Sequence, residues 1–249
     1  MLKEERQQYI LSRLNENSRV YITSLSRELK VSDDTIRRDF AEMDAQGLLT
    51  KVHGGAITKS GTSVEFTGRL QRDIQQKQNL AAKVIPLFKK GDVILIDGGT
   101  SNLEVIRQLP DELELTIYTN SFPIVSELIK RPKIEVIFLG GTLFRSSRVT
   151  VGISVFQALQ TVHADWLVLG VCSIHPQLGL SGPDREESAI KRLMLDRACK
   201  RIILADNHKL NTAENYVIGS IGDIDYLILE DDMVDEAKEM FSKYRCNII

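Results

Sequence analysis

Cysteine is scarce in this sequence, whose 249 residues include only three. Three cysteines with no Cys-x-x-Cys pair supply neither a disulfide framework nor a cysteine-rich metal site, which indicates a reducing compartment. An apolar run near the roughly 18 residues of a membrane helix is also missing, and the charged start Met-Leu-Lys-Glu-Glu-Arg is unlike a signal peptide. We therefore expect a cytoplasmic protein with no membrane segment. The histidines show no metal-ligand spacing, so we expect no metal and no cofactor.

An excess of one charge is absent as well. The chain has 32 Lys and Arg against 34 Asp and Glu, a formal net charge of -2, which excludes a protein that holds polyanions through bulk charge. Any binding of nucleic acid must be local. Hydrophobic residues make up 43 % and charged residues 27 %, as in ordinary globular proteins, so disordered and fibrous classes are excluded.

The patterning predicts two domains. Residues 1–57 contain three short helical patterns, and residues 70–249 alternate apolar runs with helical patterns. Such alternation is typical of βα units with a mainly parallel sheet. Residues 58–69, which begin with a small polar stretch without periodicity, are predicted to be a linker. The expected strands of the second domain are 93–96, 115–118, 134–138, 166–169, 201–204 and 226–229, and its expected helices are 70–89, 101–109, 123–130, 155–159, 186–199 and 234–241.

The first domain has the pattern of a winged helix-turn-helix. Helices are predicted over 2–14, over 24–30 with Thr23 as its cap, and over 33–45 with Ser32 as its cap. Two capped helices this close enclose a tight turn, and Ile36, Phe40 and Met43 give the third helix an inward face. The segment from Gly47 to Ala56 continues as an extended arm with a Gly-Gly turn, which predicts a β-wing.

Several polar residues of this domain suit DNA. Arg37 and Arg38 on the outer face of the third helix can pair with guanine or grip phosphate in the major groove, although two arginines alone also fit a solvated helix face. Ser32 can cap the helix or offer its amide to phosphate, and Thr35 can contact a base. On the wing, Lys51 suits flanking phosphates, while His53 suits either this role or a structural hydrogen bond.

The charge of the first domain argues for more than one copy. Residues 1–57 hold nine Lys and Arg and nine Asp and Glu, so the domain is neutral. Because a neutral domain binds DNA weakly by itself, we expect a dimer or tetramer to supply avidity.

The second domain carries small polar loops after its predicted strands. The first loop, Asp97 to Asn102, combines glycines, hydroxyls and a helix start, which suits a phosphate but also an ordinary strand-to-helix turn. Similar loops follow later strands at Asn120–Ser121, Gly140–Gly141 and 179–181. Since ligands of open α/β sheets bind at the carboxyl ends of strands, we expect these loops to converge on one site.

These pieces resemble the DeoR family of bacterial sugar-metabolism regulators. In the first domain the resemblance lies in Leu25 to Ser32, Thr35 to Phe40, Gly47 to Leu49 and Val52 to Ala56. In the second it lies in Ile96 to Thr100, Tyr118 to Ser121, Leu139 to Gly141, Arg148 to Gly152, Asp165 to Gly170, Gly179 to Ser181, Glu187 to Lys191 and Ala205 to Lys209. The resemblance covers almost the entire chain.

The resemblance implies a sensor domain related in fold to ribose-5-phosphate isomerase and CoA transferases, in which a phosphorylated sugar alters the grip on DNA. It implies that the effector site includes Asp97, Gly99, Thr100, Ser101, Asn120, Ser121, Gly141, Arg148 and Lys209. The chain departs from the family pattern at Ser101-Asn102, where a second Thr is usual, and at Gly152-Ile153, where Gly-Pro is frequent. The first departure leaves the identity of the ligand open.

We therefore expect a transcription regulator that represses a sugar-utilisation operon, and no enzymatic activity. Two alternatives remain at this point: a sugar-phosphate isomerase with an accessory DNA-binding domain, and an assembly protein whose winged domain contacts protein. Isomerases need a carboxylate base, and Val171-Cys172-Ser173 stands where related isomerases carry acidic residues, although Asp184 or Glu187 could serve.

Overall fold

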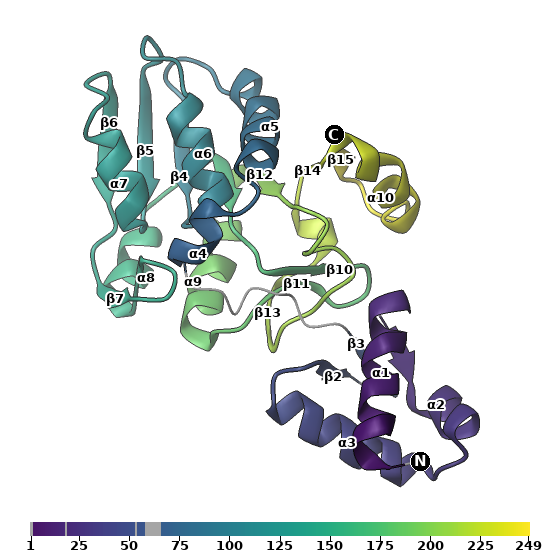
Figure 1. The fold of residues 1–249 in the computed structure, drawn as a ribbon. Coiled ribbons are helices and arrows are strands. Elements are labelled where there is room, and N and C mark those ends of the chain that lie inside the picture. Colours follow the sequence, from purple (N-terminus) through teal and green to yellow (C-terminus); the bar gives the residue numbers. More distant parts are fainter. Residues whose placement is uncertain (1, 18, 53, 58–65) are drawn as a thin grey trace.

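The structure is a computed structural model that describes residues 2–17, 19–52, 54–57 and 66–249 (Figure 1). Residues 58–65 of the predicted linker and the wing residue His53 lie outside the described residues. Positions 66–69, also predicted as linker, form the first part of a short helix, α4 (Phe66–Gln71).

The N-terminal domain has three helices and a small antiparallel sheet. The helices are α1 (Lys3–Asn17), α2 (Ile22–Leu29) and α3 (Asp33–Ala45), and the strands are β1 (Arg19–Tyr21), β2 (Thr50–Val52) and β3 (Gly55–Ile57) in the order β1-β3-β2. Their apolar faces share one core, which includes Ile10, Leu25, Ile36, Phe40 and Met43. This arrangement confirms the helix-turn-helix with a β-wing.

Of the two predicted capping residues, the structure confirms Ser32 and not Thr23. Ser32 caps α3 as predicted, since its side chain accepts a hydrogen bond from the amide of Thr35. The prediction that Thr23 caps the second helix is wrong, because α2 begins at Ile22 behind Tyr21, with no side-chain cap. Strand β1 leads directly into α2, and the first amide of the helix, that of Ile22, donates to the carbonyl oxygen of Gly54 at 3.0 Å.

The C-terminal domain is built on a parallel sheet of seven strands in the order β15-β14-β12-β9-β4-β5-β6. These strands are β4 (Val93–Ile96), β5 (Leu115–Thr119), β6 (Ile134–Phe138), β9 (Ala164–Leu169), β12 (Ala198–Leu204), β14 (Tyr226–Ile228) and β15 (Asn247–Ile248). All neighbouring pairs are parallel. The six predicted strands and the α/β class are thus confirmed, and β15 is an additional edge strand.

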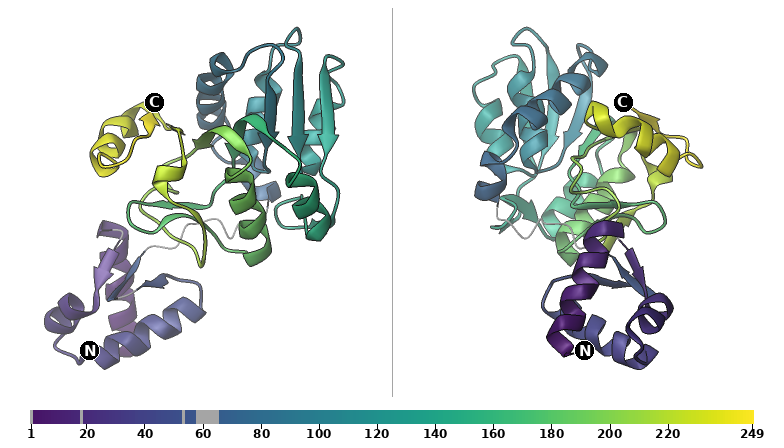
Figure 2. Two further views of the ribbon diagram at one scale, coloured as in Figure 1. Left: turned by 180° about the vertical axis from the view of Figure 1, so that it is seen from behind. Right: turned by 45° about the vertical axis from the view of Figure 1, so that its right-hand side comes forward.

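Helices cover both faces of this sheet (Figure 2). One core contains side chains of α5 (Ile74–Val84), α6 (Thr100–Gln108) and α7 (Phe122–Leu128). The other contains side chains of α8 (Ile153–Leu159), α9 (Arg185–Leu195) and α10 (Val234–Met240). Burial on both faces explains why the strands read as continuous apolar runs. Among the described helices, none combines the length and the apolar character that crossing a membrane requires.

The prediction of one helix over 70–89 is wrong. The chain forms α4 and α5, followed by a 3-10 turn (Ile85–Leu87) that contains Pro86. Between the two helices Asp73 adopts a left-handed conformation with φ +49°, which turns the chain. The predicted helix over 186–199 is shorter, because β12 already begins at Ala198.

Short antiparallel pieces were not predicted. Strands β7 (Thr142–Phe144) and β8 (Val149–Val151) form a hairpin, and β10 (Ser173–His175), β11 (Gly179–Gly182) and β13 (Tyr216–Gly219) form a small sheet. The segment 179–181, expected as a loop at a strand end, is therefore part of strand β11. This small sheet lies on the side of the C-terminal domain that faces the N-terminal domain (Figure 2).

Candidate functional site

The outer surface of α3 carries most of the residues predicted to contact DNA. The helix lies at the end of the N-terminal domain remote from the C-terminal domain (Figure 1). Arg37 and Arg38 are exposed, and Thr35 is half-buried beside the cap. Arg37 donates a hydrogen bond to Asp34 at 3.0 Å, whereas Arg38 has no ion pair among the described residues. The exposed Lys51 lies in the middle of wing strand β2.

A buried ion pair fixes α3 against α1. The guanidinium of Arg6 donates to both carboxylate oxygens of Asp39, with distances of 2.5 Å and 3.0 Å. Asp39 is only 2 % exposed, so its charge needs this partner. The pair was not predicted, although Asp39 stands three residues after Ile36 and four before Met43 and so shares their inward face. The pair sets the orientation of the helix that carries both arginines.

A pocket opens at the carboxyl ends of β4, β9 and β12. Its wall includes the loop after β4, the loop after β9, α9 and the segment that joins α4 to α5. The lining residues are Arg69, Arg72, Asp73, Lys77, Gly98, Gly99, Thr100, Ser101, Asn102, Ser147, Gly170, Val171, Cys172, Glu187, Lys191, Leu204, Asp206, His208 and Lys209. This is the edge of a parallel sheet where ligands bind in open α/β folds.

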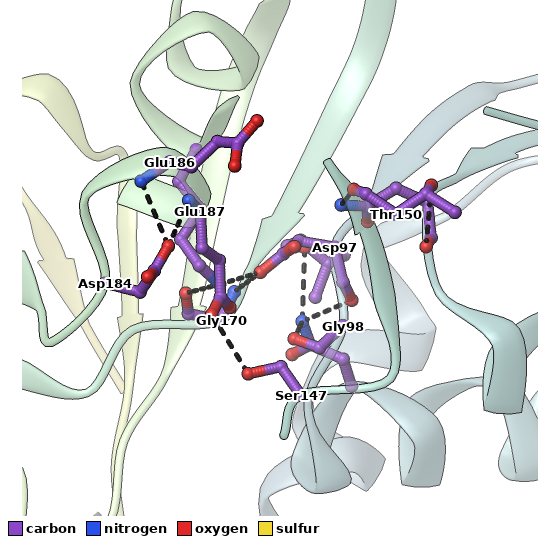
Figure 3. Close-up of polar contacts among 12 residues, drawn as sticks. Asp97, Gly98, Ser147, Thr150, Gly170, Asp184, Glu186 and Glu187 are labelled. Carbon is purple, nitrogen blue, oxygen red and sulfur yellow. Dashed lines mark hydrogen bonds and ion pairs between the residues drawn. The ribbon is translucent and has the colours of Figure 1, made fainter. Parts of the chain in front are cut away.

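A charged cluster forms the floor of the pocket, where Glu187 and Lys191 of the lining meet the buried Asp97. Figure 3 shows Asp97 and Glu187 with their polar contacts. Lys191 forms ion pairs with Asp97 and, at 3.1 Å, with Glu187. Ser147 donates to the second carboxylate oxygen of Glu187 at 2.9 Å. Lys191 also donates to the carbonyl oxygen of Gly170 at 2.8 Å. The ammonium thus ties α9 to the ends of β4 and β9.

Burial and the neighbouring charges together set the pKa values of Lys191 and Asp97. Burial by itself would lower the pKa of Lys191, but the negative charges of Asp97 and Glu187 outweigh it and raise the pKa above its usual value. Complete burial raises the pKa of Asp97, and the charge of Lys191 offsets part of that rise. One carboxylate oxygen of Asp97 has no hydrogen-bond partner among the described residues. Lys191 is consequently charged and committed to the protein at neutral pH.

Two glycines let the strand ends meet beneath the pocket. A Cβ at Gly170 would lie 2.3 Å from the carbonyl oxygen of Gly98, so no larger residue fits there. Asn102 locks the same loop, because its amide donates to the carbonyl oxygens of Asp97 and Val168. The amide of Asn102 therefore has a structural role.

Another part of the pocket lining holds more cations than carboxylates, with Asp73 and Asp206 as its two acidic residues. Lys77 is 8 % exposed, and its ammonium donates to the carbonyl oxygens of Arg69 and Arg72 at the end of α4. Burial lowers the pKa of Lys77. Lys209 contributes a second ammonium, and Arg69 and Arg72 contribute guanidinium groups. An anion in this part of the pocket would offset the electrostatic cost of holding these cations together.

The structure brings together some of the predicted effector residues. Gly99, Thr100, Ser101 and Lys209 line the pocket, and Asp97 lies buried beneath it. Four predicted residues do not line it, namely Asn120, Ser121, Gly141 and Arg148. The strand-end loops therefore do not all converge on one site, contrary to expectation.

Each of the four has another place in the fold. Asn120 and Ser121 are buried, and Asn120 donates to the carbonyl oxygen of Thr150. Gly141 packs closely on the backbone of Val151. Arg148 donates to Thr67 at 2.8 Å and lies over the ring of Phe66, so it holds α4 at the rim of the pocket.

The sequence analysis did not select Arg69, Arg72, Lys77, Ser147 or His208 as pocket residues. Arg72 and Lys77 reach the pocket through the turn at Asp73, which a continuous helical pattern concealed. Within the described part of the chain, His, Cys, Asp and Glu side chains form no group of three that could hold a metal ion.

Sequence comparison identifies both domains. The model of the DeoR-like helix-turn-helix domain matches residues 6–62, and that of the DeoR C terminal sensor domain matches residues 72–231. A winged helix-turn-helix joined to a ligand-sensing α/β domain defines a transcriptional regulator. The chain belongs to the DeoR family.

Individual relatives align over nearly their full length. The chain is 30 % identical to the HTH-type transcriptional regulator GlpR of Haloferax volcanii, over 96 % of this chain and 94 % of the relative. It is 30 % identical to the HTH-type transcriptional repressor GlcR of Bacillus subtilis, over 92 % and 89 %. A ribose 5-phosphate isomerase from Methanocaldococcus jannaschii superposes with a TM-score of 0.41 and 17 % identity over 55 % of each chain. The sequence relatives are regulators and not enzymes, so the isomerase alternative is set aside.

Proposed function

We propose that the protein represses a sugar-utilisation operon in the cytoplasm, and that a phosphorylated sugar in the pocket of the C-terminal domain controls its grip on operator DNA. The observation that carries this proposal is the polarity of the pocket. Near Lys77 the lining holds the cations of Lys209, Arg69 and Arg72 and the carboxylates of Asp73 and Asp206, a surplus of positive charge. Elsewhere in the lining Glu187 accepts hydrogen bonds from Lys191 and Ser147. A sugar phosphate has the same division between an anionic group and hydroxyls.

The phosphate fits the part of the lining with the surplus of positive charge. The loop from Gly99 to Ser101 begins α6 and supplies two hydroxyls and helix-start amides, which favour an anion. Lys77, Arg72 and Lys209 line the same pocket and supply the positive charge. The hydroxyls of the sugar fit the carboxylate of Glu187, which accepts hydrogen bonds.

Operator DNA fits the opposite end of the molecule. Arg37 and Arg38 are exposed on α3, where a recognition helix presents side chains to the major groove. Lys51 on the wing suits an adjacent phosphate, and Ser32 and Thr35 lie at the start of the helix. Since the domain is neutral overall, paired copies of the chain provide the avidity that one copy lacks.

Repression is the proposed sign of regulation. The name of the Bacillus subtilis relative GlcR describes that protein as a repressor, and a protein bound at an operator blocks transcription without needing a further contact. An activator would instead raise transcription when bound. A reporter fused to the operator, compared between cells with and without the protein, distinguishes the two: higher expression without the protein supports repression, and lower expression contradicts it.

Calorimetric titration tests the ligand assignment. The purified protein is titrated with triose, pentose and hexose phosphates, with the corresponding free sugars and with inorganic phosphate. We expect one sugar phosphate to bind, its free sugar to bind far more weakly, and Lys209→Gln to reduce the affinity by about tenfold. The exposed Lys243 lies outside the pocket wall, and Lys243→Gln serves as the charge-matched control. Binding of none of these phosphates would contradict the proposal.

A further inference from the structure

The loop from Asp206 to Glu214 connects the pocket to the N-terminal domain. It follows β12 and precedes β13. At its start Asp206, His208 and Lys209 line the pocket. At its end the carbonyl oxygen of Ala213 accepts a hydrogen bond from the hydroxyl of Thr50, the first residue of wing strand β2, at 2.9 Å. One short segment therefore contacts both the ligand site and the wing.

Hydrogen bonds hold this loop together and fix it to the small antiparallel sheet. The hydroxyl of Thr212 donates to the carbonyl oxygen of Lys209 at 2.8 Å, and the amide of Ile174 donates to the same oxygen. The amide of Glu214 donates to the hydroxyl of Ser181 on β11 at 2.8 Å. Leu210, Thr212, Ala213 and Glu214 are all buried. A displacement at Lys209 is thus transmitted along the loop and is not absorbed within it.

Lys209 is free to respond to an anion. Its ammonium reaches the carbonyl oxygen of Leu204 at a long distance of 3.4 Å, and it has no ion pair among the residues that the structure describes. An anionic ligand in the pocket offers it a stronger, charge-assisted hydrogen bond. Binding therefore shifts the side chain whose backbone anchors the loop.

The contact with the wing is buried on both sides. Thr50 is 6 % exposed and Ala213 is 2 % exposed, so the hydroxyl and the carbonyl oxygen depend on each other as partners. Asn211 of the same loop lines a cleft opposite Tyr21, Ser24 and Glu28 of the N-terminal domain. Lys51, the exposed neighbour of Thr50, follows any movement of β2.

We propose that the loop from Asp206 to Glu214 transmits occupancy of the pocket to the wing through the hydrogen bond between Thr50 and Ala213. The inference rests on the proposed function, because it assigns a route to the regulation exerted at that pocket. A ligand changes DNA affinity only as far as it binds two arrangements of the protein unequally. The loop supplies the element that differs between these arrangements.

The substitution Thr50→Val removes the hydroxyl and keeps the shape of the side chain. The coupling is measured as the ratio of DNA affinities without and with a saturating sugar phosphate, using the compound from the triose, pentose and hexose panel that binds the wild type. We expect this ratio to be about fivefold closer to one for Thr50→Val than for the wild type. Affinity for the ligand stays within about twofold of wild type, since Thr50 lies outside the pocket lining.

A second variant loosens the support of the loop inside the C-terminal domain. Ser181→Ala removes the acceptor of the Glu214 amide and detaches the loop from β11. It is expected to reduce the coupling ratio while calorimetry still shows ligand binding. Thr142→Val, at an exposed threonine of β7, is the matched control and retains the wild-type ratio.

The outcomes separate the inference from the proposed function. If no phosphate of the panel alters the DNA affinity of the wild type, the proposed function fails and the route fails with it. If the wild type responds and both Thr50→Val and Ser181→Ala retain its coupling ratio, the function stands and the route is overturned. A reduced ratio in both variants with intact ligand binding supports the route.

Discussion

The two arginines of α3 differ in what their side chains already bind. Arg37 is paired with Asp34 on the preceding turn, with an N–O distance of 3.0 Å. Arg38 is exposed and has no ion pair among the described residues. A contact from Arg37 to DNA must first break its existing pair, whereas Arg38 gives up only water.

We expect Arg38→Ala to weaken operator binding more than Arg37→Ala. Loss of a contact to a base or its flanking phosphate costs about 1–3 kcal/mol of binding free energy. For Arg37 the net loss is smaller, because the wild-type side chain must give up its ion pair with Asp34 to make the contact. Fluorescence anisotropy with labelled operator at fixed salt measures the difference, and Arg245→Ala is the control at a remote exposed arginine. A larger loss for Arg37→Ala would reverse this assignment.

The lowered pKa of Lys77 predicts a pH dependence of ligand binding. Burial lowers the pKa of its ammonium, and a bound phosphate raises it again, so binding takes up protons as the pH approaches the lowered pKa. Ligand affinity therefore falls as the pH rises, beginning below the ordinary lysine pKa of about 10.4.

The variant Lys77→Met isolates this effect. It has no ammonium to lose, so its weaker ligand affinity stays level where that of the wild type falls. Calorimetric titrations from about pH 7.5 to pH 9.5 compare the two. An identical decline in both proteins would assign the titration to another group.

Of the residues that line the pocket, the sequence predicts mainly those that are neighbours along the chain. Gly99, Thr100 and Ser101 follow one strand, and local chemistry suffices to select them. Lys77 and Arg72 reach the pocket because Asp73 reverses the chain with a positive φ, which a helical pattern does not reveal. Arg148 looked like a ligand for phosphate, but its partners are Thr67 and the ring of Phe66.

Among the elements, the ends of β4 and β9 form the base of the pocket. Gly170 follows β9 and lies against the backbone of Gly98, which follows β4. Replacing Gly170 with Ala forces these two strand ends apart, because the new Cβ would overlap a carbonyl oxygen. We expect Gly170→Ala to abolish measurable ligand binding by calorimetry while hydrogen exchange in the N-terminal domain stays unchanged. Ligand binding at wild-type affinity would show that the base tolerates the shift.

The start of α3 depends on one hydroxyl. Ser32 accepts a hydrogen bond from the amide of Thr35 at 3.2 Å and lies 2.9 Å from its hydroxyl. We expect Ser32→Ala to destabilise the helix start by about 1 kcal/mol, so that amides of its first turn exchange hydrogen about fivefold faster. Ser32→Asp keeps an acceptor and retains most of the protection. Equal exchange rates in Ser32→Ala and wild type would refute the cap.

The buried strands of the parallel sheet are predictable from sequence, and the short antiparallel strands are not. The strands of the parallel sheet are apolar because both faces are covered, so β4, β5 and β6 coincide closely with their predicted ranges. Strands β7 and β11 have three and four residues, too few for an alternation to stand out. Their pairing depends on contacts distant in sequence, such as β11 with β13.

For the whole molecule, the central question is how a nearly neutral chain binds DNA and how a ligand controls that binding. Its charge of -2 provides no general attraction to a polyanion. Affinity must come from a few contacts on α3 and the wing, and we propose that paired copies of the chain multiply it. Ligand control must reach these contacts from a pocket in the other domain.

The most direct measurement is a gel shift near physiological salt with DNA from upstream of the protein's own gene. It compares the wild type with the Arg37→Ala/Arg38→Ala double variant, each with and without the panel of sugar phosphates. The predicted result is a specific complex of the wild type that one sugar phosphate changes, and no complex with the folded double variant. A folded wild type that binds neither this DNA nor competing genomic fragments, or a complex that no sugar phosphate alters, would contradict ligand-controlled repression.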